Sequence, residues 1–98
     1  MTTKETTTDN IETLKYLATD GVSWAQHNVG CIYIKRKQYK DALDFLTLAS
    51  NQGCGKSSYN IALIHGKIFK CDDSAKKWLV ISSKQNYKKA NILLKRFK

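Results

Sequence analysis

The stretch Ala42–Leu63, "ALDFLTLASNQGCGKSSYNIAL", decides the fold of this 98-residue chain, because two helical patterns in it flank one glycine-containing turn. The segment Gly55-Lys56-Ser57 resembles the end of a phosphate-binding loop. That loop also needs a glycine at position 50, which is Ser here, and a strand before the loop. The residues up to Gln52 instead place apolar side chains at helical spacing. The sequence therefore predicts an interhelix turn, and not a nucleotide-binding loop.

Length and composition indicate one small, folded, helical domain. The chain has no Pro, five Gly and 42% hydrophobic residues, which favours helices joined by short connections. No apolar run approaches the length of a membrane span, and the polar start "MTTKETTTDN" does not resemble a signal peptide. We expect a flexible tail over residues 1–9, a single domain over residues 10–98 and no membrane partner.

The cysteines and histidines predict neither a disulfide framework nor a cofactor. Cys31, Cys54 and Cys71 are odd in number and lack CxxC spacing, so reduced thiols in a cytoplasmic protein are expected. His27 lies four residues before Cys31 on one helix face, but two ligands are too few for a structural zinc ion. No paired carboxylates or activated thiol can be identified. We expect no metal, no cofactor and no enzymatic activity.

The positive charge lies entirely in the second half of the chain. Residues 1–50 carry six Lys or Arg and six Asp or Glu, whereas residues 51–98 carry eleven and two, which accounts for the net charge of +9. No acidic residue follows Asp73. This asymmetry predicts an acidic partner.

A repeat with a spacing of 32 to 33 residues explains the glycines of the opening stretch. Gly21, Gly53 and Asn86 fall in register, and a small residue follows each of them four positions later. The other matched columns are Asn28 with Asn60; Val29, Ile61 and Leu94; Gly30 with Ala62; Ile32 with Ile64; Ala42 with Ala75; Phe45 with Trp78; and Leu14, Leu46 and Leu79. The chain therefore consists of two full units, about 21–52 and 53–85, with a half unit at each end.

The repeat predicts an all-α fold of about six helices, an α–α superhelix in which stacked pairs share one core. The expected helices cover residues 10–20, 23–37, 39–52, 57–70, 72–85 and 87–97. Gly21, Gly53 and Asn86 stand just after helix ends, where a left-handed residue closes the last turn. Asp72-Asp73-Ser74 is expected to cap the fifth helix.

The columns resemble a known repeat family. The pattern resembles the Sel-one-like repeat, a relative of the tetratricopeptide repeat, at Ala25-x3-Val29-Gly30-x2-Tyr33 and then Ala42-x2-Phe45-Leu46-x2-Ala49-Ser50-x2-Gly53. The second unit keeps Ala62 and Ala75-x2-Trp78-Leu79. The loop "KRKQYKD" is shorter than the usual Gly-rich loop of that family and nearer to the tetratricopeptide pattern. The resemblance implies a short solenoid that acts as an adaptor, scaffold or inhibitor without catalysis.

The resemblance also implies a binding groove for a peptide or protein along the first helix of each pair. The groove residues, by motif position, are Trp24, His27, Asn28, Lys35, Lys56, Tyr59, Asn60 and Lys67. Some relatives clamp a terminal carboxylate with five Lys, Asn and Arg residues, and only Asn28 and Lys56 match that set.

Several of these residues have two interpretations. Asn28 and Asn60 either bind a ligand or satisfy backbone groups within the stack. Trp24 is either an anchor for a partner or a cover for the first helix pair.

The last predicted helix, "YKKANILLKRFK", is amphipathic and basic. Its charged face is either a polar cap that ends the stack or a docking surface for an acidic partner. Binding of nucleic acid or another polyanion there is the alternative function. The basic surface consists of Lys84, Lys88, Lys89, Lys95 and Arg96. Because two and a half units make a short stack, self-association that extends the stack is a further hypothesis.

Overall fold

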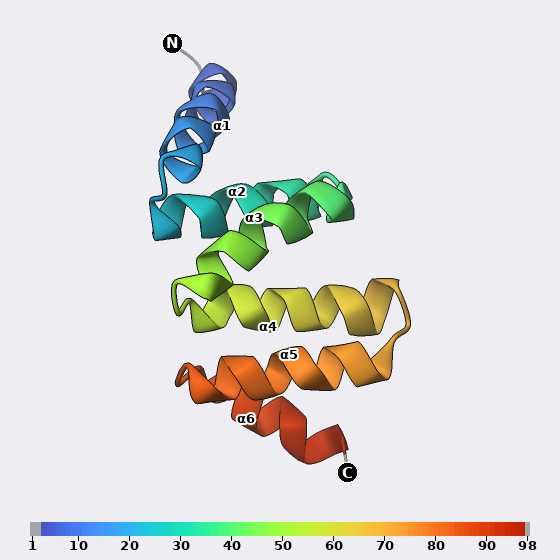
Figure 1. Cartoon of the computed structure of the whole chain (residues 1–98). Coiled ribbons are helices and arrows are strands. Elements are labelled where there is room, and N and C mark those ends of the chain that lie inside the picture. The colour runs from blue at the N-terminus through green and yellow to red at the C-terminus, as the bar shows by residue number, and fades with distance from the viewer. Residues whose placement is uncertain (1–2, 98) are drawn as a thin grey trace.

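The computed structural model describes residues 3–97, which form a single stack of six α-helices; after α1, successive helices run in alternating directions across the view (Figure 1). The helices are α1 (Thr3–Thr19), α2 (Ser23–Lys35), α3 (Tyr39–Asn51), α4 (Gly55–Leu63), α5 (Asp72–Lys84) and α6 (Lys88–Leu94). A π-helical turn, η1 (Ile64–Ile68), continues α4, and a 3₁₀ turn, η2 (Lys95–Phe97), continues α6. No strand occurs in residues 3–97, and each helix packs mainly against its chain neighbours. The predicted all-α superhelix is confirmed.

The three turns between units share one backbone conformation. Gly21, Gly53 and Asn86 have positive φ angles of 96°, 95° and 69°, as predicted from their residue types. In each turn, the next residue's N–H donates to a carbonyl five residues earlier. These bonds are Val22 to Leu17 at 3.0 Å, Cys54 to Ala49 at 3.1 Å and Tyr87 to Ser82 at 3.2 Å. Each turn therefore joins one helix pair to the next with the same positive φ angle and the same backbone hydrogen bond.

Polar contacts between units recur with the same spacing. Gln26 Nε2 donates to the Ala18 carbonyl at 3.1 Å, and the Ser50 and Ser58 hydroxyls lie 2.6 Å apart. Ser83 and Asn91 form the third contact, 33 residues further along the chain. A second series uses glutamines at equivalent positions. Gln52 donates to Gln26 at 2.9 Å and to the Gly21 carbonyl at 3.0 Å; Gln85 donates to the Ser50 carbonyl at 3.0 Å and accepts from Ser58 at 2.6 Å. The repeat seen in the sequence is therefore a repeat of hydrogen bonds.

Small residues allow the helices of a pair to cross closely. A Cβ atom added at Gly30 would lie 2.5 Å from both Cγ and Cδ2 of Leu46, so α2 and α3 touch at this point. Ala42 and Ala62 are also buried, and the Tyr33 and Phe45 rings stack with centroids 5.9 Å apart. Two buried clusters result. One is Ala18, Ala25, Val29, Tyr33, Ala42, Leu46, Ile61 and Ile64, and the other is Ala62, Leu79 and Ala90. Trp78 packs against both clusters and joins them into one core.

Three helix starts differ from the sequence prediction, and the smallest difference is at α6, which begins at Lys88, one residue later than predicted. The first helix begins at Thr3, whereas the sequence predicted a tail over residues 1–9 and a start near residue 10. The segment 3–10 contains neither Gly nor Pro, so no residue in it breaks a helix. Residues 1, 2 and 98 lie outside the described residues. The fourth helix begins at Gly55, two residues earlier than predicted.

The predicted cap of the fifth helix is wrong. Cys71 occupies the N-cap position with an extended backbone, and no side chain makes a capping hydrogen bond there. Asp72 and Asp73 belong to the first turn of α5 instead. Their carboxylates still favour the helix start, because they lie at the positive end of the helix dipole.

The loop between α4 and α5 contains backbone features that the sequence did not predict. Residues 64–68 form a π-helical turn where an ordinary helix was expected to residue 70. Lys70, with a φ angle of 56°, follows this turn, and Lys37, with a φ angle of 62°, follows α2 in the same way.

Within residues 3–97, no helix has the length and apolar character that a bilayer span requires.

Candidate functional site

The first helices of the two full pairs, α2 and α4, carry seven of the eight predicted groove residues, and Lys67 lies in η1. The structure distributes these residues among three separate hollows. We name these the Trp24 hollow, the Ile34 hollow and the Tyr59 hollow after one lining residue each. Lys35, at the end of α2, is exposed.

The Trp24 hollow lies where α2 begins, opposite the start of α4. Its volume is about 540 Å³, and its lining is Ser23, Trp24, His27, Asn28, Gln52, Gly53, Cys54 and Lys56. Four predicted groove residues therefore meet here. The Trp24 side chain is 58% exposed, and Asn28 and Lys56 are exposed as well. Trp24 lies at the rim of the hollow and leaves most of its indole in contact with solvent, so it covers little of the first helix pair.

His27 connects α2 to α4 through Nδ1, and its Nε2 atom contacts Cys31 one turn further along α2. Nδ1 lies 2.8 Å from the Ser57 hydroxyl, and Nε2 lies 3.5 Å from Cys31 Sγ. Asn60 Nδ2 donates to Cys31 Sγ at 3.5 Å and adds a second bridge between the two helices. Because these polar atoms are already paired within the protein, His27 and Asn60 act in helix packing. Asn28, by contrast, remains exposed for a ligand.

This His–Ser–Cys cluster is unsuited to nucleophilic catalysis. Burial raises the pKa of the Cys31 thiol, so the thiol stays protonated at neutral pH. The Ser57 side chain is fully buried and cannot reach a substrate. Among the described residues, no group of three or more His, Cys, Asp or Glu side chains is placed to hold a metal ion. The chemistry of this cluster therefore supports packing between α2 and α4.

The position of His27 predicts a pH-dependent stability. Burial, with the nearby Lys56 ammonium as the smaller cause, lowers the pKa of His27 below its usual value of 6.5. Below about pH 6.5 His27 therefore binds a proton more readily in the unfolded chain than in the folded chain. The free energy of unfolding consequently decreases as the pH is lowered. We expect urea titrations to show lower stability at about pH 5.5 than at about pH 7.5. In the variant His27→Gln, the stability should depend less on pH than in the parent protein. An equal dependence on pH in the two proteins would exclude His27 as the cause.

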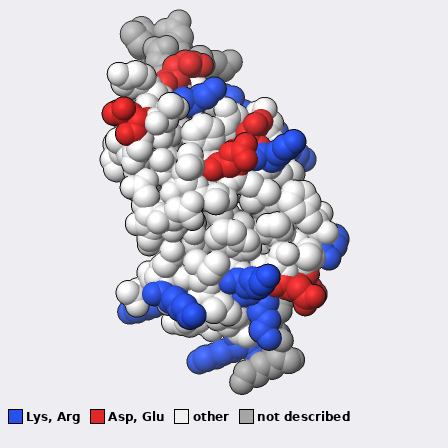
Figure 2. Space-filling view, viewed as in Figure 1, with Lys and Arg blue, Asp and Glu red and all other residues white. Residues whose placement is uncertain are grey.

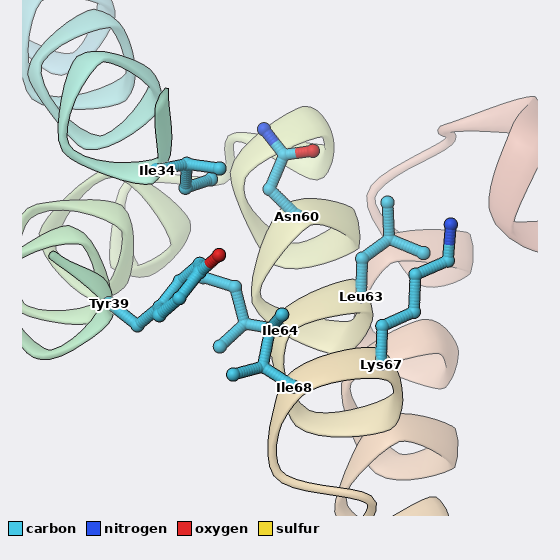
Figure 3. Close-up of a pocket in the computed structure, with 7 residues that line it drawn as sticks. All are labelled: Ile34, Tyr39, Asn60, Leu63, Ile64, Lys67 and Ile68. Atoms are coloured by element: carbon cyan, nitrogen blue, oxygen red, sulfur yellow. The ribbon is translucent and has the colours of Figure 1, made fainter. Parts of the chain in front are cut away.

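The Ile34 hollow is an apolar depression between the α2–α3 turn and the end of α4 (Figure 3). Its volume is about 210 Å³, and it is lined by Ile34, Tyr39, Asn60, Leu63, Ile64, Lys67 and Ile68. Figure 3 shows Ile34 and Tyr39 facing Ile64 and Ile68 across the hollow. Two predicted groove residues, Asn60 and Lys67, lie here. The apolar lining was missed, because only the packing of two units places Ile34 and Ile68 in one hollow.

The Tyr59 hollow lies between α4 and α6. Its volume is about 200 Å³, and it is lined by Tyr59, Lys89, Ile92, Leu93 and Arg96. The Tyr59 ring packs edge-on against Tyr87, with centroids 5.1 Å apart. Gly55 makes this approach possible, because a Cβ atom there would lie 2.9 Å from Tyr87 Cβ. The hollow thus joins a predicted groove residue, Tyr59, to the predicted basic surface.

All five residues of the basic surface are exposed. Lys88, Lys89, Lys95 and Arg96 belong to α6 and η2, and Lys84 ends α5. Figure 2 shows Lys and Arg gathered over the end of the molecule formed by α5 and α6. Ile92, 60% exposed, lies among them and was not predicted as a site residue. Its place on the charged side of the amphipathic helix was the signal that could have identified it.

These three hollows and their exposed aromatic and basic side chains are the candidate site. The chain matches no family model, no curated protein and no solved structure.

Proposed function

We propose that this chain is a non-catalytic protein-interaction module that binds a peptide or protein along α2, α4 and α6. The observation that carries the proposal is the exposure of Trp24 beside a hollow of about 540 Å³. Tryptophan is among the residues that most often dominate binding energy at protein interfaces. A 58% exposed Trp with neighbouring amide and ammonium groups has the composition of such an anchor.

The arrangement of hollows supports an extended ligand. The Trp24 and Ile34 hollows both lie between the first and second units, and the Tyr59 hollow lies between the second unit and the C-terminal half unit. A ligand that crosses the stack meets the exposed Trp24, the apolar Ile34 hollow and the apolar floor of the Tyr59 hollow, with polar side chains between them. This alternation suits a peptide with spaced apolar residues. The resemblance to Sel-one-like and tetratricopeptide repeats supports the same function.

The proposal predicts that Trp24→Ala combined with Asn28→Ala abolishes partner binding without unfolding the protein. Loss of an anchor of this kind costs about 2 kcal/mol or more, which is roughly a thirtyfold loss of affinity. Both side chains are exposed, so the melting temperature should stay within about 2 °C of the parent value. The measurement is affinity capture of partners from host lysate, quantified by mass spectrometry, with thermal melts in parallel.

The matched control for this test is Tyr16→Ala. Tyr16 is also an exposed aromatic residue, at 74%, but it lies on α1 and lines none of the three hollows. Equal capture by the parent and by the folded Trp24/Asn28 variant would remove the Trp24 hollow from the interface. Equal loss with Tyr16→Ala would show that general surface hydrophobicity causes the binding.

Binding of nucleic acid or another polyanion is a second candidate, favoured by one observation. The segment from Lys88 to Arg96 has four exposed cations and no acidic residue. Lysine side chains on a helix face contact phosphates without reading bases. Such binding would weaken steeply with salt.

We propose the cytoplasm, or another reducing compartment, as the working location. Cys31, Cys54 and Cys71 are all unpaired and half-buried. Free thiols persist where glutathione and thioredoxin keep them reduced.

A further inference from the structure

Charge is segregated by the position of a helix within its pair. The segments Ser23–Lys35, Gly55–Ile68 and Lys88–Phe97, which are the first helices, contain no Asp or Glu. Their seven Lys and Arg residues are all exposed, namely Lys35, Lys56, Lys67, Lys88, Lys89, Lys95 and Arg96. The acidic residues from Glu12 onward lie on α1, α3 and α5 or in the turn after α1. The helices α2, α4 and α6 therefore contribute only basic charges to the face that they form, and this face attracts anions; one acidic residue of α5, Asp72, lines a hollow beside Lys67 at its edge.

The cations are unevenly distributed on this face and increase toward α6. Helix α2 has only Lys35, α4 with η1 has Lys56 and Lys67, and α6 with η2 has four. Figure 2 shows the resulting concentration of blue at the α6 end, with the acidic groups on this view mostly over the α1 and α3 part. An anionic ligand is therefore drawn to the α6 end of the groove face.

The Tyr59 hollow combines this charge with an apolar floor. Lys89 and Ile92 of α6 and Arg96 of η2 line the same side of the hollow, with Leu93 beside them. Ile92 is 60% exposed at the centre, with a cation about one helical turn away on either side. Tyr59 closes the opposite wall from α4, fixed by its edge-on contact with Tyr87. A ligand that fits this hollow has an apolar side chain flanked by negative charges.

We propose that the Tyr59 hollow binds an acidic segment of a partner protein, with one Leu- or Phe-sized side chain on Ile92 and carboxylates on Lys89 and Arg96. This inference rests on the proposed function and names the chemical class of its partner. A hollow of about 200 Å³ accommodates a single side chain of that size. Arg96 can form a bidentate pair with a carboxylate, which fixes the direction of the peptide.

Two other occupants fit the structure less well. A nucleic acid would leave the aliphatic floor of Ile92 and Leu93 without an apolar partner, and α2 would offer it one cation only. A second copy that extends the stack would have to place one of its helices against α6, in the way that α3 packs against α2 within one molecule. Lys95 stands there in the column of Gly30 and Ala62, where the inner pairs cross closely. On α1, the exposed Thr13 replaces the apolar Phe45 and Trp78 of the same column.

The test is fluorescence anisotropy with short labelled peptides at about 0.15 M salt. The probe has a central Leu-Phe pair between runs of Asp and Glu. One control peptide replaces the acidic residues by Lys and Arg, a second replaces Leu-Phe by Gly-Gly, and labelled oligothymidylate is a third probe. We expect the acidic Leu-Phe peptide to bind at least about tenfold more tightly than each of these controls.

Two charge-matched variants locate the binding. Lys89→Glu with Arg96→Glu should weaken binding of the acidic Leu-Phe peptide by about tenfold or more. Lys76→Glu with Lys77→Glu makes the same change in net charge on the exposed side of α5, and it should change the affinity by less than about twofold. Ile92→Ala should weaken the Leu-Phe peptide but not the Gly-Gly peptide. Circular dichroism establishes that each variant is folded.

Several results would overturn the inference. These are the absence of binding by the acidic Leu-Phe peptide, equal loss in the α5 control, equal affinity for oligothymidylate, and self-association that the Lys89/Arg96 variant removes. In each case the proposed function is still tested separately by the capture experiment with the Trp24/Asn28 variant. Those two residues lie in a different hollow from Tyr59.

Discussion

Gly30→Leu will destabilise the protein strongly and lower its melting temperature by about 10 °C or more. The first added atom already lies 2.5 Å from two atoms of Leu46, whose side chain is fully buried and has no free space to move into. Overpacking of this kind costs about 3 kcal/mol or more, whereas the gain in helix propensity from replacing Gly is at most about 1 kcal/mol. The steric term therefore decides. Far-UV circular dichroism should show a thermal unfolding transition at a much lower temperature than that of the parent protein.

A matched pair of smaller substitutions controls for the chemistry of losing a glycine. Gly30→Ala still brings its Cβ atom against Leu46 and should lower the melting temperature. Gly66→Ala meets only Ala75 Cβ, at 3.4 Å, and should change stability little. Equal stability of the two alanine variants would contradict the close crossing of α2 and α3.

Leu79→Ala is expected to cost about 2–5 kcal/mol, the second largest effect. Leu79 is 1% exposed and forms one cluster with Ala62 of α4 and Ala90 of α6, so truncation opens a cavity among three helices. A domain of this size has a total stability of about 5–10 kcal/mol. Urea denaturation should therefore show a large fall of the midpoint.

Ile81→Ala is the control for the Leu79 substitution. Ile81 lies on the same helix but is 37% exposed, so its loss should cost less than about 1 kcal/mol. Similar midpoints for the two variants would show that the α4–α5–α6 core is not formed as described.

The parts of the fold that depend on residue type could be predicted from the sequence. Gly21, Gly53 and Asn86 were identified as turn residues because few other residues adopt a left-handed conformation easily. Gly30 falls in one repeat column with Ala62, and the structure shows the close helix crossing that requires a small residue there. In both cases one steric requirement limits the position to a few residue types.

The parts that depend on tertiary contact could not be predicted. Lys37 and Lys70 also adopt positive φ angles, but lysine gives no local signal for that conformation. The π-helical turn Ile64–Ile68 likewise has no sequence signature. The distribution of groove residues among three hollows follows from the rotation of each helix about its axis. That rotation turns Tyr59 toward α6 and Asn60 toward α2. A predicted groove therefore identified most of the residues but not their grouping.

The recurring polar contacts between units also determine how the length of this protein can change. Residues 18, 50 and 83 each pair with a residue eight positions later, and the turns between them share one backbone geometry. A tandem duplication of residues 53–85 would therefore give the added segment the same hydrogen-bonding partners at both of its boundaries. Such a variant needs no new core and no new loop. Gain or loss of whole units is thus a conservative mutation for this chain, whereas insertion of a few residues inside a helix would misalign the contacts of that helix with its two neighbours.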